Sequence, residues 1–295
     1  MSHALRPDEK LSDGIRRIAR KQIRAIRKEL CEKRHRRQGG SIHDARKRVK
    51  MLRALLRLIH DASGHKIFRK ENCVFRGIAR SLSLRRDVEV QLKTLDKLRR
   101  QRGRAVAEND FYVLRRLLLK RASRLLKESS IRRKALKTEL NTAMERVKKW
   151  PVDGLKRSDV RIGIKKTYER GGQALAMAER SGTMENLHEW RKRVKDLWHH
   201  LRLLQPLCPK ILAGLVDDLE RLGEHLGDDH DAAMLAEAAK QSKPRESETL
   251  ARMIEARRVR LQRAAFQLGW RVYAEKPGVF ARRIDNCRGA PHGKS

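Results

Sequence analysis

The chain has 295 residues, of which 73 are Lys or Arg and 36 are Asp or Glu, so its formal net charge is +37. This excess favours a polyanionic partner (nucleic acid, an inorganic phosphate polymer or an anionic membrane face) over a merely solvated basic surface. Apolar residues make up 39%, which excludes a disordered basic tail and is enough for a packed core.

The amino-terminal residues 1–7 lead into charged helix, and no stretch approaches the roughly 18 uncharged apolar residues that span a bilayer. We therefore expect a cytoplasmic protein without membrane contact. The four cysteines, Cys31, Cys73, Cys208 and Cys287, show no C-x-x-C spacing. They predict reduced thiols and neither a disulfide framework nor a zinc site.

Apolar residues recur three and four positions apart along nearly the whole chain, which predicts an all-α protein. The loop Pro151–Gly154 divides it into halves, residues 10–150 and 155–285, and residues 286–295 are expected to form a disordered tail. Each half is expected to be a bundle of about four helices, and the two bundles to pack about a pseudo-twofold axis. The sequence carries no signal for an oligomeric state.

One octapeptide occurs twice. HDARKRVK, residues 43–50, returns as HEWRKRVK, residues 188–195, and both copies continue into leucine-rich helix. Ser41 and Thr183 precede the copies as candidate helix caps. Repetition at this distance predicts two structurally equivalent halves.

Helical projection at about 100° per residue separates two faces on each copy. The predicted buried stripes are Ala45, Val49, Leu52, Leu56 and Ile59 in the first copy and Trp190, Val194, Leu197, Leu201 and Leu204 in the second. The first cationic face consists of His43, Arg46, Lys47, Lys50, Arg53 and Arg57. The second cationic face consists of His188, Arg191, Lys192, Lys195 and Arg202, with Trp198 at its edge.

Neither face carries an evident carboxylate partner, and each is roughly 20 Å long at 1.5 Å per residue. Such a face suits a ligand whose negative charges repeat, and a solvated basic helix is the alternative. His43 and His188 begin the two faces. Each is interpreted as an anion ligand, with a structural histidine or a metal ligand as alternatives.

A second cluster, residues 225–231, has the composition of a metal site, but Asp228 or Asp229 could equally cap a helix starting there. The equivalent residues of the first half, Arg85, Arg86 and Asp87, offer no comparable ligand set. We expect capping, with Asp87 and Asp231 orienting nearby basic residues. No metal or other cofactor is predicted.

Both copies of H-x-x-R-[KR]-x-[VI]-K resemble the paired signatures of the CHAD (conserved histidine α-helical domain) family. Residues 85–87, 226–231 and 269–277 resemble further family segments, and residues 1–285 would form this one domain. The resemblance implies two helical bundles around a basic central cavity that binds inorganic polyphosphate, and association with polyphosphate granules. Ser83 stands where the family has glycine, and His230 stands opposite Arg86.

The resemblance carries the binding role onto the matching positions His43, Arg46, Lys47, Lys50, His188, Arg191, Lys192 and Lys195. The projected faces add Arg53, Arg57 and Arg202, and the second helix segment adds Arg86. The predicted function is polyphosphate binding without catalysis and without catalytic residues. One alternative is a DNA- or RNA-binding protein, disfavoured because only 4% of residues are aromatic. The other is a metal-dependent polyphosphate or phosphoester hydrolase, disfavoured because no P-loop is present.

Overall fold

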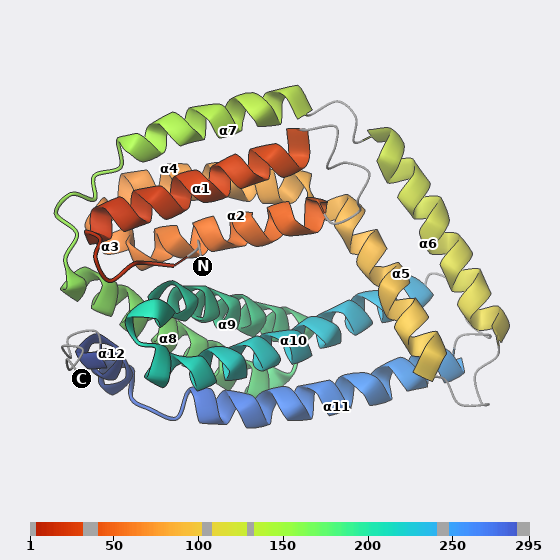
Figure 1. Ribbon diagram of the computed structural model, residues 1–295. Helices are drawn as coiled ribbons and strands as arrows, with labels where there is room; N and C mark the ends of the chain where they lie inside the picture. The colour runs from red at the N-terminus through yellow and green to blue at the C-terminus, as the bar shows by residue number, and fades with distance from the viewer. Residues whose placement is uncertain (1–3, 32–40, 102–107, 129–132, 241–247, 288–295) are drawn as a thin grey trace.

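The computed structural model describes residues 4–31, 41–101, 108–128, 133–240 and 248–287. Every regular element within these ranges is a helix, which confirms the predicted all-α class (Figure 1). The α-helices are α1 (Leu11–Cys31), α2 (Ser41–Leu58), α3 (His60–Ser63), α4 (His65–Ser81), α5 (Ser83–Gln101), α6 (Glu108–Glu128), α7 (Arg133–Lys148), α8 (Arg157–Ser181), α9 (Met184–Leu204), α10 (Pro209–Lys240), α11 (Glu248–Val272) and α12 (Pro277–Cys287), and the 3₁₀-helix η3 (Gln205–Leu207) joins α9 to α10. None of the described helices combines the length and the apolarity that crossing a bilayer requires.

Two groups of helices lie against each other in Figure 1, with α1, α2, α4 and α7 in one and α8 to α12 in the other. One apolar core runs through both, because α2 and α9 are in contact and bury their leucines in the same cluster. Leu52 and Leu55 of α2 belong to it together with Leu197 and Leu201 of α9. The division at residues 150–155 and the pseudo-twofold axis stay predictions.

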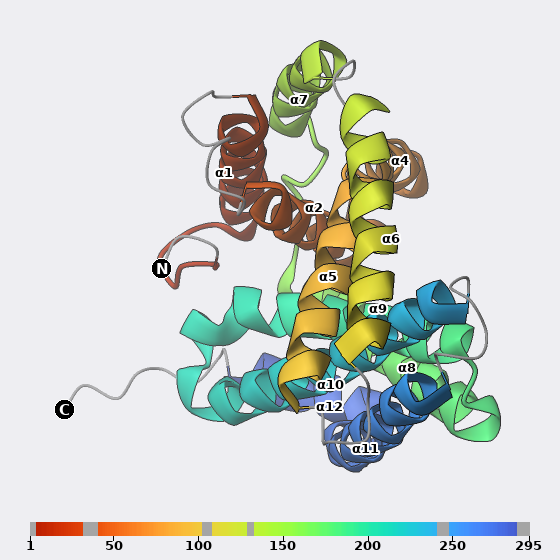
Figure 2. The same ribbon diagram turned by 90° about the vertical axis from the view of Figure 1, so that its right-hand side faces the viewer.

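Helices α5 and α6 leave the first group and pack on the second, as Figure 2 shows most clearly. They form a smaller core with α10 and α11. Its buried side chains include Leu95 of α5, Phe111 of α6, Leu235 of α10 and Ile254 of α11. The first half of the sequence therefore stabilises the second half directly.

The start of α9 follows from local chemistry. Thr183 caps it by accepting a hydrogen bond from the Asn186 amide at 3.3 Å, as predicted. Before it, Gly182 ends α8 in the left-handed conformation (φ 57°), which glycine adopts without steric cost. Helix α2 begins at Ser41 itself, so the predicted cap there is not confirmed.

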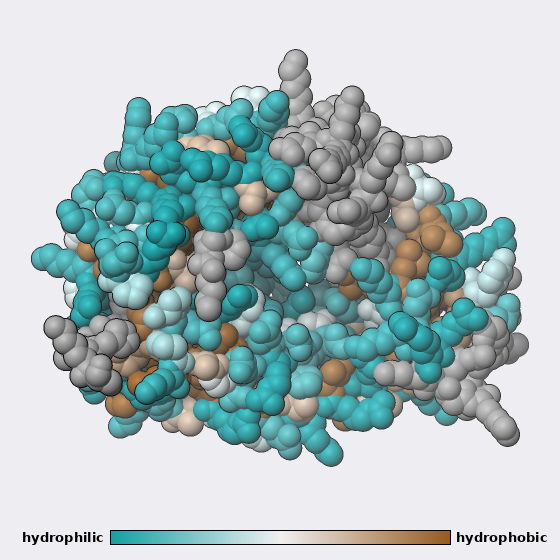
Figure 3. Space-filling view, viewed as in Figure 1, coloured by the Kyte–Doolittle hydropathy of each residue, from teal (hydrophilic) through white to brown (hydrophobic). Residues whose placement is uncertain are grey.

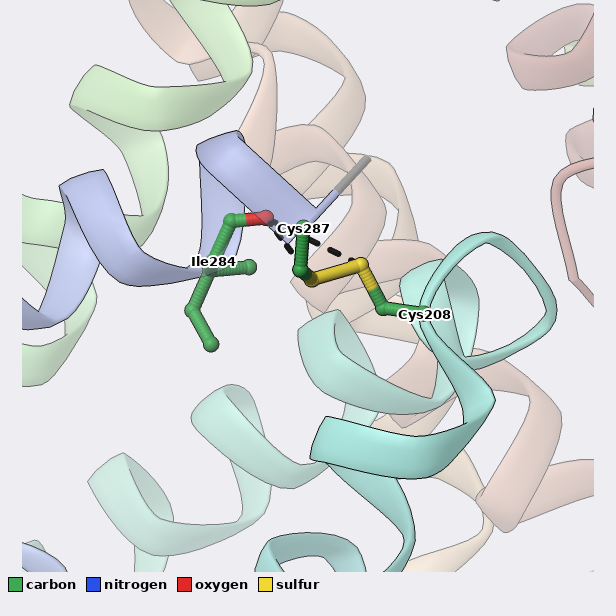
Figure 4. Close-up of a disulfide and its surroundings, with 3 residues drawn as sticks. All are labelled: Cys208, Ile284 and Cys287. Carbon is green, nitrogen blue, oxygen red and sulfur yellow. Dashed lines mark hydrogen bonds between the residues drawn. A yellow bond between two sulfur atoms is a disulfide. The ribbon is translucent and has the colours of Figure 1, made fainter. Parts of the chain in front are cut away.

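The prediction of reduced thiols is wrong for two cysteines. Cys208 and Cys287 form a disulfide, with their Cα atoms 5.8 Å apart, that ties α12 to the start of α10 beside Ile284 (Figure 4). They are 79 positions apart, so their pairing depends on proximity in the fold and not on local spacing. Cys73 is a free, exposed thiol. Helix α12 also continues to Cys287, two residues into the predicted tail, and the rest of that tail lies outside the described residues.

Candidate anion-binding site

The predicted apolar stripes of α2 and α9 are buried. All ten residues expose 1% or less of their surface: Ala45, Val49, Leu52, Leu56, Ile59, Trp190, Val194, Leu197, Leu201 and Leu204. Because the stripes face the core, the cationic faces are turned out of it. Figure 3 shows that hydrophilic side chains cover most of one side of the molecule.

Two polar contacts fix α2 against α9. The Nε2 atom of His200 lies 2.7 Å from the Ala54 carbonyl oxygen. Burial lowers the pKa of His200 to about 4, so the imidazole is neutral and donates this hydrogen bond. One helical turn along α2, Arg57 donates to Asp196 at 3.1 Å. The two repeat helices are therefore held side by side.

Cations of both faces act on one another across this contact. Desolvation first, and then the charges of Arg191, Arg46 and Lys195, lower the pKa of Lys50 to about 8, while Asp231 opposes them. Desolvation, Arg191 and Lys47 likewise lower the pKa of Lys195. The two faces thus converge, and their residues repel one another.

Lys50 is both accessible to solvent and partly desolvated by neighbouring protein atoms. Its accessible surface is that of an exposed residue, yet desolvation is the largest cause of its lowered pKa. Its side chain is therefore reached by solvent while protein atoms surround much of it. The two observations do not conflict, because accessible area reflects contact with solvent and desolvation reflects the surrounding protein.

Two glycines on α10 make room for the second cationic face. A Cβ atom at Gly223 would lie 2.6 Å from Cε and 2.7 Å from Nζ of Lys195. A Cβ atom at Gly227, one turn later, would lie 3.0 Å from Nη2 of Arg191. Both cationic side chains therefore lie along the backbone of α10. The predicted site did not include Gly223, although its spacing of four from Gly227 was a usable signal.

Histidines gather at the same place. The rings of His188 on α9 and His230 on α10 are 4.5 Å apart, and neither Nδ1 has a hydrogen-bond partner among the described residues. Desolvation first, and then neighbouring basic groups, lower the pKa of each to about 4, so both are neutral at pH 7. His199, which the predicted site omitted, lies edge-on to Trp198, and burial with Lys195 holds its pKa well below the usual value.

Other predicted residues are held by polar partners. In the first cationic face, Arg46 donates to the Ala79 carbonyl at 3.5 Å and Arg53 to the Asn72 side chain at 3.0 Å. The expectation that the faces lack paired carboxylates is wrong. Arg57 pairs with Asp196, and Lys192 pairs with Glu189 at 2.8 Å, three residues earlier on α9.

The remaining predicted residues differ in how far the structure describes them. His43 is half-buried and Lys47 is exposed. Arg202 lies over the ring of Trp198, with 4.7 Å between Cζ and the ring centroid. The side chain of Arg86 lies outside the described residues, so its membership in the site stays a prediction.

The predicted helix cap at residues 228–229 is wrong, because α10 runs unbroken from Pro209 to Lys240. Asp228 accepts from Lys97 at 2.7 Å and from Arg257 at 3.0 Å. Asp229 accepts from Arg258 at 3.2 Å and from Gln262 at 2.9 Å. Both carboxylates therefore join α10 to its neighbours. Across the described part of the chain, no three His, Cys, Asp or Glu side chains are grouped so that they could hold a metal ion.

Comparison with known proteins supports the family expected from the repeat. A search of curated proteins finds no match. Among solved structures, the chain is similar to "PptA from Streptomyces chartreusis", with a TM-score of 0.62 and 16% sequence identity over 88% of this chain and 99% of that one, a similarity of fold. The CHAD domain model matches residues 17–240, which include both cationic faces. The chain therefore belongs to the CHAD domain family.

Proposed function

We propose that this chain binds inorganic polyphosphate between α2 and α9 and does not hydrolyse it. The proposal places the protein in the cytoplasm, on polyphosphate granules. One observation carries it: Lys50 of α2 lies close enough to Arg191 and Lys195 of α9 for their charges to repel one another. Neighbouring protein atoms desolvate these side chains, yet Lys50 stays accessible to solvent. Clustered like charges destabilise a folded protein, and an anionic ligand removes that cost by neutralising them.

The extent of the site favours a polymer over a compact anion. Without Arg57, which Asp196 holds, the first cationic face spans residues 43 to 53, about 15 Å at 1.5 Å per residue. The second cationic face, on α9, lies beside it through the α2–α9 contact. Successive phosphates of a flexible chain can follow both rows and release counterions, so affinity should fall steeply as salt increases.

Nucleic acid is the competing polyanion. Base recognition needs free aromatic faces, but Lys195 and Arg202 each lie 4.7 Å from the centroid of the Trp198 ring. Trp190 is fully buried, and the exposed aromatic residues Tyr112 and Trp270 lie on α6 and α11. Polyphosphate has no base to stack, which makes it the better match for this site.

The decisive experiment reverses two charges in the site. Lys50→Glu combined with Lys195→Glu should weaken binding of polyphosphate of defined length about 100-fold or more, since each lost charge-assisted contact costs about 1.5–3 kcal/mol. Lys137→Glu combined with Lys165→Glu is the matched control, because both lysines are exposed and lie on α7 and α8. The control changes net charge equally and should weaken binding less than about 5-fold at physiological salt.

Equal binding by the two double variants would contradict the proposal. Duplex DNA of matched charge, titrated in the same salt series, separates the competing partner: polyphosphate should displace DNA, and DNA should not displace polyphosphate. Orthophosphate release from polyphosphate with added magnesium or manganese would instead support the hydrolase alternative.

A further inference from the structure

The two cationic faces differ at one position of the repeat. An offset of 145 pairs Lys50 with Lys195 and Arg57 with Arg202, but it pairs Arg53 with Trp198. The second face therefore carries an indole where the first carries a guanidinium. The substitution removes a charge from the middle of a row of phosphate-binding candidates, so the aromatic ring calls for a physical explanation.

The ring of Trp198 contacts the cations on either side of it in the sequence. The Nζ atom of Lys195, three residues earlier, lies 4.7 Å from the ring centroid. The Cζ atom of Arg202, four residues later, lies at the same distance. Residues three and four apart are neighbours on a helix surface, so the three side chains form one continuous group along α9.

This group holds its cations differently from the first face. Arg57, the equivalent of Arg202, is paired with the carboxylate of Asp196. Among the described residues, neither Lys195 nor Arg202 forms an ion pair with a carboxylate, although Glu220 and Glu224 act on Lys195 from further away. A carboxylate neutralises the cation that it holds and competes with an anionic ligand, whereas an aromatic ring attracts a cation and leaves its charge in place.

We propose that Trp198 is a positioning residue of the anion site, which holds the charged ends of Lys195 and Arg202 in place without neutralising them. The inference rests on the proposed function only in that the ligand of these two cations is polyphosphate. Ordering two long side chains before binding reduces the entropy lost when the ligand binds. Trp198 therefore contributes affinity without contributing a charge.

Trp198→Leu tests the proposal because leucine fills much of the space but has no π face. The variant should bind polyphosphate about 3- to 10-fold more weakly than the parent, and Trp198→Phe should recover part of the loss. The dependence of affinity on salt should keep the parent's slope, because no charge is removed. If Trp198→Phe bound polyphosphate no better than Trp198→Leu, the lost affinity would come from loosened packing and not from the missing aromatic face.

Trp270→Leu is the matched control, since Trp270 is exposed on α11 and its indole contacts Glu179 instead of a cation of the site. It should bind polyphosphate as the parent does. A Trp198→Leu variant that binds with the parent's affinity while the parent itself binds polyphosphate would overturn the positioning role and leave the proposed function intact.

A ligand-free measurement covers the case in which the parent fails to bind polyphosphate, which would refute the proposed function. The thermal midpoints of Trp198→Leu, Arg202→Met and the double variant form a cycle. Coupling between ring and cation should make the two shifts non-additive by about 1–2 °C. Additive shifts would show that Trp198 does not hold Arg202, whatever ligand the site binds.

Discussion

The two cationic faces have nearly the same sequence but different surroundings. On α2, the arginines are engaged by polar groups: Arg53 by Asn72 and Arg57 by Asp196. On α9, Lys195 and Arg202 lie over the Trp198 ring, and Lys195 also lies against Gly223 of α10. The comparison teaches that the repeat specifies which charges are present, while the neighbouring helices decide whether a charge stabilises the fold or stays available to a ligand.

The largest expected difference is between Arg57 and Arg202, which occupy equivalent positions. Arg57→Met leaves the buried Asp196 without its closer partner and should lower the free energy of unfolding by about 2 kcal/mol. The loss is smaller than for a buried carboxylate left with no cation, because Arg193 remains 3.6 Å from Asp196. Arg202→Met should lower the free energy of unfolding by no more than about 0.5–1 kcal/mol, the coupling to Trp198, and should weaken polyphosphate binding. Denaturant unfolding and ligand titration of both variants check this.

The control is Asp196→Asn in the Arg57→Met background, which removes the buried charge and should restore part of the lost stability. If Arg57→Met and Arg202→Met lowered stability equally, the distinction between a structural and a ligand-binding arginine would fail.

Much of this arrangement could be predicted from the sequence. Helical periodicity identified the all-α fold and all ten buried stripe residues, because a period of 3.6 reports directly which face is turned inward. The sequence could not show what lies opposite each charge. Asp196 follows Lys195 in the chain yet pairs with Arg57, 139 positions away, through the α2–α9 crossing.

The same reasoning explains the errors. The composition of residues 225–231 was compatible with a helix start, but the apolar surface of α10 continues through it, with Leu222, Leu226 and Leu235 all buried. The pairing of Cys208 with Cys287 likewise depends on how α12 folds back beside η3, which no local pattern encodes.

The histidine pair gives the next largest effect. His188 and His230 have folded-state pKa values lowered from 6.5 to about 4, so the unfolded chain binds protons that the folded state refuses between these two values. The free energy of unfolding should therefore fall as the pH decreases from 6.5 to 4. His188→Gln combined with His230→Gln should reduce that fall by about 1–2 kcal/mol at pH 4.5, measured by denaturant unfolding.

If polyphosphate binds here as proposed, its phosphates should reverse the protonation preference of the pair. They favour imidazolium beside Lys50, Arg191 and Lys192, while Glu189 already acts in that direction on His188. Polyphosphate binding should take up protons, and affinity should rise as the pH falls from 7 to 5 in the parent more than in the double variant. His65→Gln, an exposed position on α4, is the control. An equal rise in all three proteins would place the pair outside the site.

The smallest expected effect comes from filling the space beside Lys195 without changing its charge. Gly223→Ala puts a methyl group where Cε and Nζ of Lys195 lie, and the flexible end of that side chain can move aside at little cost to folding. Polyphosphate affinity should fall about 3- to 5-fold because the ammonium group is displaced, with the salt slope unchanged. Gly214→Ala on the same helix is matched, because nothing lies within 4 Å of its added Cβ atom. It should raise stability by about 0.5–1 kcal/mol through helix propensity and leave affinity alone. If both variants bound polyphosphate with the parent's affinity, the position of the Lys195 ammonium group would not matter, and the second cationic face would act only as diffuse charge.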